Sequence, residues 1–216
     1  MNNSLLRTLA LPILFCLSSL SHAALIVFTS EASFIAATSA QGVDTFSDLV
    51  PGTVILSPIN RNAGVYGYTG TSPGGFFAVG TAGDPALSTN FANDSITFDN
   101  FTGGAQAIGA NFFDSDLNGA FASGSITVTA VDQTGTVTQT IINATEDSFL
   151  GFVSTDSLVS LTVTTLDPNL FATVDNLTIG LRAGGNPTPV PAPGSMVLLL
   201  GGLGIMGLSA RRRRRT

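Results

Sequence analysis

The strongest constraint on the fold is an alternation of apolar and polar residues that runs from residue 42 to residue 179. Successive side chains of a strand point to opposite faces, so this period of two predicts strands with one buried and one solvated face. Gly, Asp and Asn separate the segments and predict turns. The expected strands cover residues 42–46, 53–57, 64–69, 75–79, 95–99, 107–113, 125–131, 136–142, 149–154, 158–166 and 171–179.

The clearest predicted hairpin joins residues 125–131 to residues 136–141 through an Asp-Gln-Thr-Gly turn. The apolar side chains from Ile126 to Ala130 share one face, whereas Thr127 and Thr129 share the other. We therefore expect one face of this hairpin to pack and the other to meet solvent.

The segment before residue 42 predicts a first strand within residues 24–29 and then one short helix. Ser30 is a typical N-cap, and helix formers follow it over residues 31–37. About ten short strands with regular turns predict an all-β fold, an antiparallel β-sandwich of the jelly-roll type.

The first 23 residues have the features of a secretory signal peptide. Arg7 precedes an apolar run over residues 9–20, and small residues flank His22 at the expected cleavage site. The only cysteine, Cys16, and the only histidine, His22, both lie in this segment. A domain without either residue has no Ser-His-Asp triad, no thiol nucleophile and few ligands for zinc.

The region between the two ends is strongly acidic. Residues 24–193 contain all fourteen acidic side chains but only two of the eight basic ones, Arg61 and Arg182. Such a chain repels phosphate backbones, so we expect no nucleic-acid partner. Divalent cations are the partners that this charge favours.

The C-terminal 33 residues divide into a linker and a three-part tail. Residues 184–189 are rich in Gly and Pro and predict a linker between the domain at 24–183 and the tail at 190–216. An apolar stretch at 196–210 predicts a short transmembrane helix, and the positive-inside rule places the arginines after it in the cytoplasm. The motif is Val190, Pro191, Ala192, Pro193, Gly194 and Ser195, and the membrane stop is Arg211, Arg212, Arg213, Arg214 and Arg215.

This order of motif, apolar helix and arginine cluster resembles the PEP-CTERM sorting tail of Gram-negative bacteria. Ala192 stands where the commonest form of that motif has glutamate. The resemblance implies export by the secretion machinery, transient anchoring in the inner membrane and cleavage near the motif by an exosortase, a membrane-embedded protease. The released protein would then reach the cell surface or the extracellular polysaccharide matrix.

One segment has the opening of a calcium-binding loop. Asp114, Asp116 and Asn118 place oxygen donors at alternate positions before Gly119, a spacing that suits a hard cation. An EF-hand would require Glu at the twelfth position, which is Ser125 here. The alternative interpretation is a strand connection whose Asp and Asn cap a turn. Calcium is the only cofactor that the sequence suggests.

A short internal echo supplies two more acidic candidates. Residues 97–104 and 173–180 match at five of eight positions, including an Asp-Asn pair in each segment. We interpret the echo as two strands with similar roles, and Asp99 or Asp175 would add a calcium ligand if the fold brought it near.

Two other site types rest on few residues. Tyr66 and Tyr68 lie two apart in an expected strand and would form a glycan platform if exposed, although two half-buried rings are the alternative. A carboxylate glycosidase would require Glu146 or Asp147 to face Asp114 or Asp116.

The sequence therefore predicts a non-enzymatic, exported surface or matrix protein that acts in structure, adhesion or glycan contact. The alternatives are a calcium-dependent carbohydrate-binding module and a carboxylate glycosidase.

Overall fold

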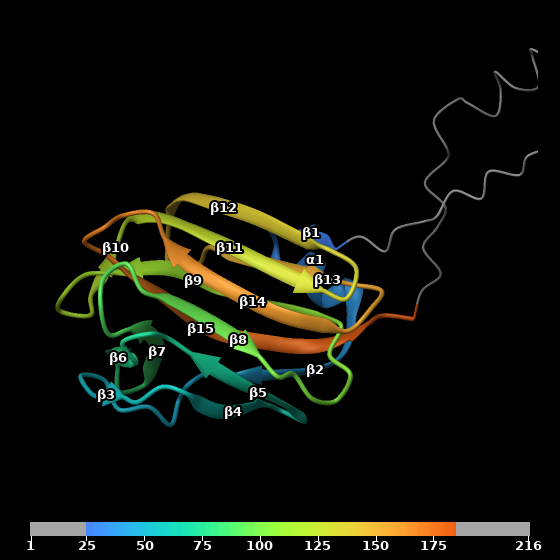
Figure 1. Cartoon of the computed structure of the whole chain (residues 1–216), viewed down its shortest axis with the longest axis horizontal. Coiled ribbons are helices and arrows are strands. Elements are labelled where there is room, and N and C mark those ends of the chain that lie inside the picture. Colours follow the sequence, from blue (N-terminus) through green and yellow to red (C-terminus); the bar gives the residue numbers. More distant parts are fainter. Residues whose placement is uncertain (1–24, 185–216) are drawn as a thin grey trace, which may run out of the picture. The chain divides into compact units, whose positions relative to one another are not determined.

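The computed structural model describes residues 25–184. Within them, fifteen strands form two antiparallel sheets, and there is one helix (Figure 1). The nine-stranded sheet contains, in spatial order, β1 (Ile26–Phe28), β13 (Phe149–Val153), β9 (Ala107–Ser115), β15 (Phe171–Arg182), β7 (Asp84–Thr89), β6 (Phe76–Thr81) and β3 (Val54–Ile55), with β10 (Phe121–Ala122) paired to β9 and β2 (Thr38–Asp44) paired to β15. The six-stranded sheet contains β12 (Thr136–Ala144), β11 (Gly124–Asp132), β14 (Leu158–Thr165), β8 (Ser95–Asp99), β5 (Tyr66–Thr71) and β4 (Ile59–Ala63).

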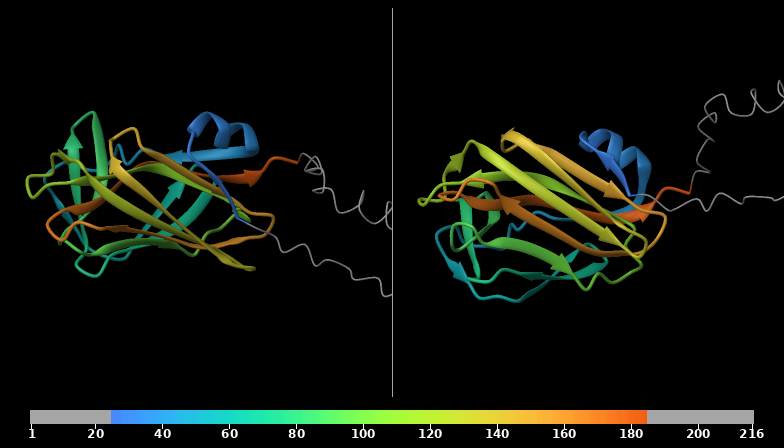
Figure 2. Two further views of the ribbon diagram at one scale, coloured as in Figure 1. Left: turned by 90° about the horizontal axis from the view of Figure 1, so that it is seen from above. Right: turned by 45° about the horizontal axis from the view of Figure 1, so that its top comes forward.

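The two sheets pack face to face around one apolar core (Figure 2). Fully buried side chains such as Ile126 and Leu161 come from the six-stranded sheet, and Ile108, Phe112 and Val174 come from the other. The chain passes from one sheet to the other after β3, β5, β7, β8 and β10, and again after β12, β13 and β14. The predicted antiparallel β-sandwich of the jelly-roll type is confirmed.

The helix α1 (Glu31–Ala37) covers one part of the outer face of the nine-stranded sheet. Its buried Phe34 packs against Gly151, where an added Cβ would lie 2.4 Å from the ring, and beside Phe149. Ala107, at the start of β9, belongs to this small cluster. The helix has the predicted bounds, but the Ser30 side chain makes no capping hydrogen bond.

The outer face of the six-stranded sheet is a regular array of hydroxyl groups. The registers place Thr138, Thr129, Thr162, Thr97 and Thr71 in one row across five strands. Hydroxyl groups of neighbours within the row lie 3.0 Å apart at Thr129 and Thr138 and 3.1 Å apart at Thr97 and Thr162. This face is the solvated side that the period of two predicted.

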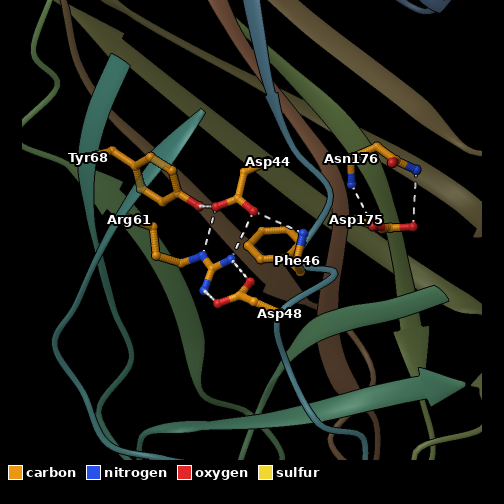
Figure 3. A network of polar contacts seen from close by, with 7 residues as sticks. All are labelled: Asp44, Phe46, Asp48, Arg61, Tyr68, Asp175 and Asn176. Carbon is orange, nitrogen blue, oxygen red and sulfur yellow. Dashed lines mark hydrogen bonds and ion pairs between the residues drawn. The ribbon is translucent and has the colours of Figure 1, made fainter. Parts of the chain in front are cut away.

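An ion-pair network links the two sheets at one edge (Figure 3). The Nε of Arg61, in β4, donates a hydrogen bond to Asp44 of β2 at 2.7 Å. A terminal nitrogen of the same guanidinium donates to Asp48 at 2.5 Å. The guanidinium carbon lies 5.1 Å from the centre of the Phe46 ring. Tyr68 of β5 donates its hydroxyl proton to Asp44 at 2.7 Å. Burial and then the negative charge of Asp44 raise the pKa of Tyr68, which therefore stays protonated.

Candidate functional site: a groove on the outer face of the nine-stranded sheet

The part of the outer face that α1 leaves uncovered forms a groove of about 580 Å³. Asn111 and Phe113 of β9 point into it, and the register places Asp175 of β15 directly opposite Asn111. The groove combines carboxylates and amides with apolar groups. Its polar side chains are Thr81, Asp84, Asn111, Asn118, Glu146, Asp147, Asp175 and Asn176, and its larger apolar ones are Val79, Phe113 and Phe121.

A β-bulge in β15 shapes the polar side of this groove. The register with β9 shifts between Asp175 and Thr178, and Asn176 has a left-handed φ of 53°. The Asn176 backbone N–H donates to Asp175 Oδ1 at 2.7 Å, and its side-chain amide donates to Asp175 Oδ2 at 3.1 Å (Figure 3). The same amide donates to Asn111 Oδ1 at 3.4 Å. Bulges commonly redirect side chains at binding sites, and this one turns two polar groups into the groove.

The electrostatics of the groove disfavour ionisation of Asp175. Burial raises the pKa of Asp175 to about 6, and the negative charges of Asp84 and Asp44 act in the same direction, whereas the Asn176 N–H opposes them. A carboxyl group with this pKa changes between donor and acceptor just below neutral pH. The groove can therefore pair with ligand hydroxyl groups in either protonation state.

The loop between β9 and β10 crosses the outer face and bounds the groove. Gly119 has a φ of 76°, and an added Cβ would lie 3.1 Å from Val79 of β6. Asp116 Oδ1 accepts the backbone N–H groups of Asn118 at 2.8 Å and Ala120 at 3.0 Å. These two hydrogen bonds lower the pKa of Asp116, with the bond from Ala120 contributing most. The segment predicted as a calcium loop thus forms a turn capped by Asp116.

On the other side of this loop, the same face holds a second, smaller compartment of about 150 Å³. The rings of Phe77 and Phe171 and the exposed Leu117 line it. Hydroxyl groups of the buried Ser88 and Ser115 lie 3.0 Å apart at its base. The outer face therefore carries one polar and one largely apolar compartment, both of which include Val79.

The third predicted calcium ligand, Asp114, lies on the opposite side of β9. Its side chain is fully buried, contacts Gly124 at the core, and has no hydrogen-bond partner that meets normal geometry for either oxygen. Burial raises the pKa of Asp114 to about 6, the Thr165 hydroxyl lowers it and the Asp167 charge raises it. Asp114 and Asp116 therefore do not converge on one ion, and no three His, Cys, Asp or Glu side chains within residues 25–184 form a metal-binding group.

The two tyrosines do not form the predicted platform. Tyr66 and Tyr68 are 2% and 3% exposed, because both side chains point into the core. Their hydroxyl groups donate to the Ala40 carbonyl at 2.8 Å and to Asp44 at 2.7 Å. The prediction was wrong because the alternation also allowed the inward direction, and buried tyrosine hydroxyls normally find such partners.

Of the other acidic residues singled out in the sequence, two lie together in the groove and two lie elsewhere. Glu146 and Asp147 both line the groove, whereas Asp116 lines the smaller compartment. Asp99 is on the six-stranded sheet, where it accepts the side-chain amide of Asn100 at 2.9 Å. The pairing of Glu146 or Asp147 with Asp114 is therefore wrong, since Asp114 faces the core.

Sequence reasoning missed Asp84, Asn111 and Phe121. No local motif marks them, because they belong to three strands that only the sheet brings together. Asp84 and Phe121 begin the unpredicted strands β7 and β10. The sequence did contain a signal for the neighbouring Asp175 and Asn176, which is the Asp-Asn echo. In both copies of the echo, Asn100 and Asn176 adopt a left-handed φ and donate a side-chain hydrogen bond to the preceding aspartate.

The predicted signal peptide at 1–23, all but the first residue of the predicted linker at 184–189, and the tail at 190–216 with its predicted transmembrane helix at 196–210 lie outside the described residues. Within residues 25–184, no helix is long and apolar enough to cross a membrane.

Comparison with solved structures finds several weak likenesses, among them those to three proteins. The xylan-binding CBM22-1 domain of Paenibacillus barcinonensis Xyn10C is 13% identical, with a TM-score of 0.34, over 63% of this chain and 99% of that chain. The CBM22-1 and GH10 modules of Clostridium thermocellum endo-1,4-β-D-xylanase 10B are 16% identical, with a TM-score of 0.33, over 67% of this chain and 29% of that chain. The exo-β-1,3-galactanase of Phanerochaete chrysosporium is 16% identical, with a TM-score of 0.30, over 57% of this chain and 29% of that chain. TM-scores this low say nothing about a shared ligand.

Comparison with curated protein sequences finds no match. A family model described as the PEP-CTERM protein-sorting motif matches residues 189–214, which include the motif, the apolar stretch and most of the arginine cluster. The resemblance seen in the sequence is thereby confirmed. The chain carries a PEP-CTERM protein-sorting motif at its C-terminal end, and this signal implies an exported substrate of an exosortase.

Proposed function

We propose that this chain is an exosortase-sorted protein of the cell surface or extracellular matrix with a non-enzymatic, adhesive role, and that its outer groove binds a glycan. The sorting motif supports the destination. The groove supports the ligand class, because its size and mixed lining suit an oligosaccharide. After cleavage of the tail, the β-sandwich would meet extracellular polysaccharide.

The single observation that carries this proposal is the arrangement of amides, carboxylates and an exposed ring around one cavity. Asn111, Asn176 and Asp175 present hydrogen-bonding groups from neighbouring strands, which suits the hydroxyl groups of a sugar. Phe121 is 41% exposed at the edge of the groove and tilts against Phe113, with the ring centres 6.3 Å apart. A ring in this position can pack on the apolar face of a pyranose.

The test of glycan binding is a glycan array, probed with the full chain and extended with polysaccharide from the cells that make it. We expect Phe121→Ala to weaken binding about tenfold, equivalent to about 1.4 kcal/mol of lost packing. Val65→Ala is the matched control, because Val65 is 83% exposed and lies outside the groove. Equal binding by both variants, or no glycan ligand, would contradict the proposal.

The sorting proposal has its own test, which is mass spectrometry of the surface-localised protein. We expect the signal peptide and residues 196–216 to be absent, because the proposed exosortase cuts near residues 190–195. A surface form that keeps its arginine cluster would contradict this part of the proposal.

Calcium-dependent glycan binding is the second candidate. The observation that favours it is that Asp84 and Asp175 both line the groove, where the negative charge of Asp84 helps to raise the pKa of Asp175. An ion that binds only the folded state raises the melting temperature. Melting curves with calcium and with a chelator should then differ, and the difference should vanish in Asp175→Asn. Identical curves exclude this candidate.

A hydrolysis assay on the same glycans separates binding from catalysis. The non-enzymatic proposal predicts no release of reducing sugar. Hydrolysis by the wild-type chain that is lost in Glu146→Gln would instead make the groove an active site, since a glycosidase acts through paired carboxyls.

A further inference from the structure

The longest exposed edge of the sandwich is strand β12, at one end of the six-stranded sheet. It has nine residues, and no strand within residues 25–184 pairs with its outer edge. Its sequence, Thr-Val-Thr-Gln-Thr-Ile-Ile-Asn-Ala, contains no charged residue and no proline. Edge strands of this kind are templates for pairing with another chain, and most proteins protect them.

The other ends of the two sheets show such protection. Strands β1 and β3 are only three and two residues long, and β4 carries the paired cation Arg61. Short edges and charged edge residues both disfavour pairing between molecules. Strand β2, which pairs only with β15, has seven residues, ends at the charged Asp44 and lies against Ala63 of β4 at Gly42. Among the edge strands of the described residues, β12 is therefore the longest, and it is the only one of more than three residues without a charged side chain.

The backbone of β12 directs alternate hydrogen-bonding groups away from the sheet. The Asp132 N–H donates to the Gly135 carbonyl at 3.0 Å, and Val131 then lies opposite Thr136. Hydrogen-bonded and non-hydrogen-bonded pairs alternate along an antiparallel ladder. Residues 137, 139 and 141 therefore bond to β11, whereas residues 136, 138, 140 and 142 turn their N–H and C=O groups outward.

We propose that β12 pairs antiparallel with β12 of a second copy of this chain, with a twofold axis at Gln139. In this register Thr138 lies opposite Thr140 of the second copy, so both present outward backbone groups. Val137 lies opposite Ile141, and both side chains pack against the core side of the sheet. The pattern from Thr136 to Ile142 is thus self-complementary, as a symmetric interface requires.

The distribution of charge also favours β12 over other surfaces as the place where two copies meet. Residues 24–193 carry fourteen acids against two bases, so two copies repel each other over most of their surfaces. Strand β12 has no ionisable side chain, and the threonine row beside it is also uncharged. Pairing here would continue the rows through Thr138 and Thr140 into the second molecule without bringing acidic side chains together at the seam.

The first test uses proline at a position whose N–H faces outward. Thr140→Pro removes that donor and leaves the bonds between β11 and β12 intact, whereas the matched Thr140→Ala keeps the donor. For the full chain in detergent, we expect light scattering to show dimers for the wild type and Thr140→Ala. Thr140→Pro should halve the mass without changing the circular dichroism spectrum. A monomeric wild type, or a dimeric Thr140→Pro, would overturn the proposal.

The second test uses a disulfide on the twofold axis. In a Cys16→Ser background, Gln139→Cys places two thiols opposite each other across a non-hydrogen-bonded pair, where Cβ atoms lie about 4.5–5.5 Å apart. We expect mild oxidation to give a covalent dimer. Asn62→Cys, on the exposed opposite edge strand β4, should remain monomeric under the same conditions. Equal cross-linking of the two variants would contradict the register.

Discussion

The two outer faces of this sandwich both belong to antiparallel sheets, but one is regular and the other carries a groove. On the six-stranded sheet, rows of threonine such as Thr129 beside Thr138 lie in the part of the ladder, residues 126–131 of β11, where the register is regular. On the nine-stranded sheet, the bulge at Asp175 and the loop at Gly119 break that regularity and enclose two compartments. Strands with a regular alternation of apolar and polar residues therefore give a surface without a groove, whereas the bulge and the loop that interrupt this regularity form the candidate binding site.

The difference also explains where hydroxyl groups are buried. Thr173 and Ser88 point to the outer face of the nine-stranded sheet, yet both are fully buried, and their hydroxyl groups lie 3.0 Å apart. Threonines such as Thr129 and Thr138 on the other face also pair through their hydroxyl groups, but these groups remain at the solvent side, where water can replace a lost partner.

The largest expected effect comes from Arg61→Met, which removes the cation that ties the two sheets together. It leaves Asp44 with Tyr68 but without its ion pair, and breaking a buried pair costs about 3–5 kcal/mol. Urea denaturation should show this loss in the free energy of unfolding. A change below about 1 kcal/mol would mean that the two faces do not depend on this link.

A smaller effect should separate the two faces directly. Thr173→Val removes a hydroxyl that lies 3.0 Å from both Ser88 and Ser115, and it should lower the free energy of unfolding by about 1–2 kcal/mol. Thr129→Val on the other face is the matched control and should stay within about 0.5 kcal/mol. Equal losses of unfolding free energy in the two variants would contradict the distinction between the face that carries the groove and the regular threonine face.

The loop that bounds the groove should be sensitive to a single methyl group. Gly119→Ala places a Cβ in a left-handed conformation and against Val79, so we expect a loss of about 1 kcal/mol or more in thermal denaturation. In the hairpin of the six-stranded sheet, Gly135→Ala meets no atom within 4 Å and should change stability little. The reverse order would contradict the assigned role of the loop.

The smallest effect concerns pH. The pKa of Asp175 is raised to about 6 from 3.8, so between these values the folded state binds more protons than the unfolded state. Stability should therefore rise as pH falls from 7 to 5, by about 1 kcal/mol for this group after allowing for solvent screening. Denaturation at both pH values should show a smaller rise in Asp175→Asn. An unchanged rise would place the titration elsewhere.

Much of the fold could be predicted from the sequence, because alternation and turn residues are local signals. Strand β8 and helix α1 lie within their predicted bounds. Strand β7 escaped prediction because it begins with Asp84-Pro85, and β4 did so because its centre is Asn-Arg-Asn. These two strands owe their conformation to their neighbours in the sheet rather than to their own composition.

The site was less predictable, since it depends on which face each strand turns outward. The alternation around Tyr66 and Tyr68 allowed both directions, and the core took both rings. Asn93, Asn100, Asn143 and Asn176 each have Ser or Thr two residues later in the sequence. All four have positive φ, so the residue that tolerates a left-handed backbone marks the turns and bulges.

The most direct test of the glycan groove is a titration of the isotope-labelled chain with its extracellular polysaccharide, followed by NMR. We predict that amide signals of Asn111, Asn118 and Asn176 shift, while those of Thr129 and Thr162 on the opposite face do not. Shifts confined to the threonine face, or none at all, would contradict the assignment of the groove as the binding site.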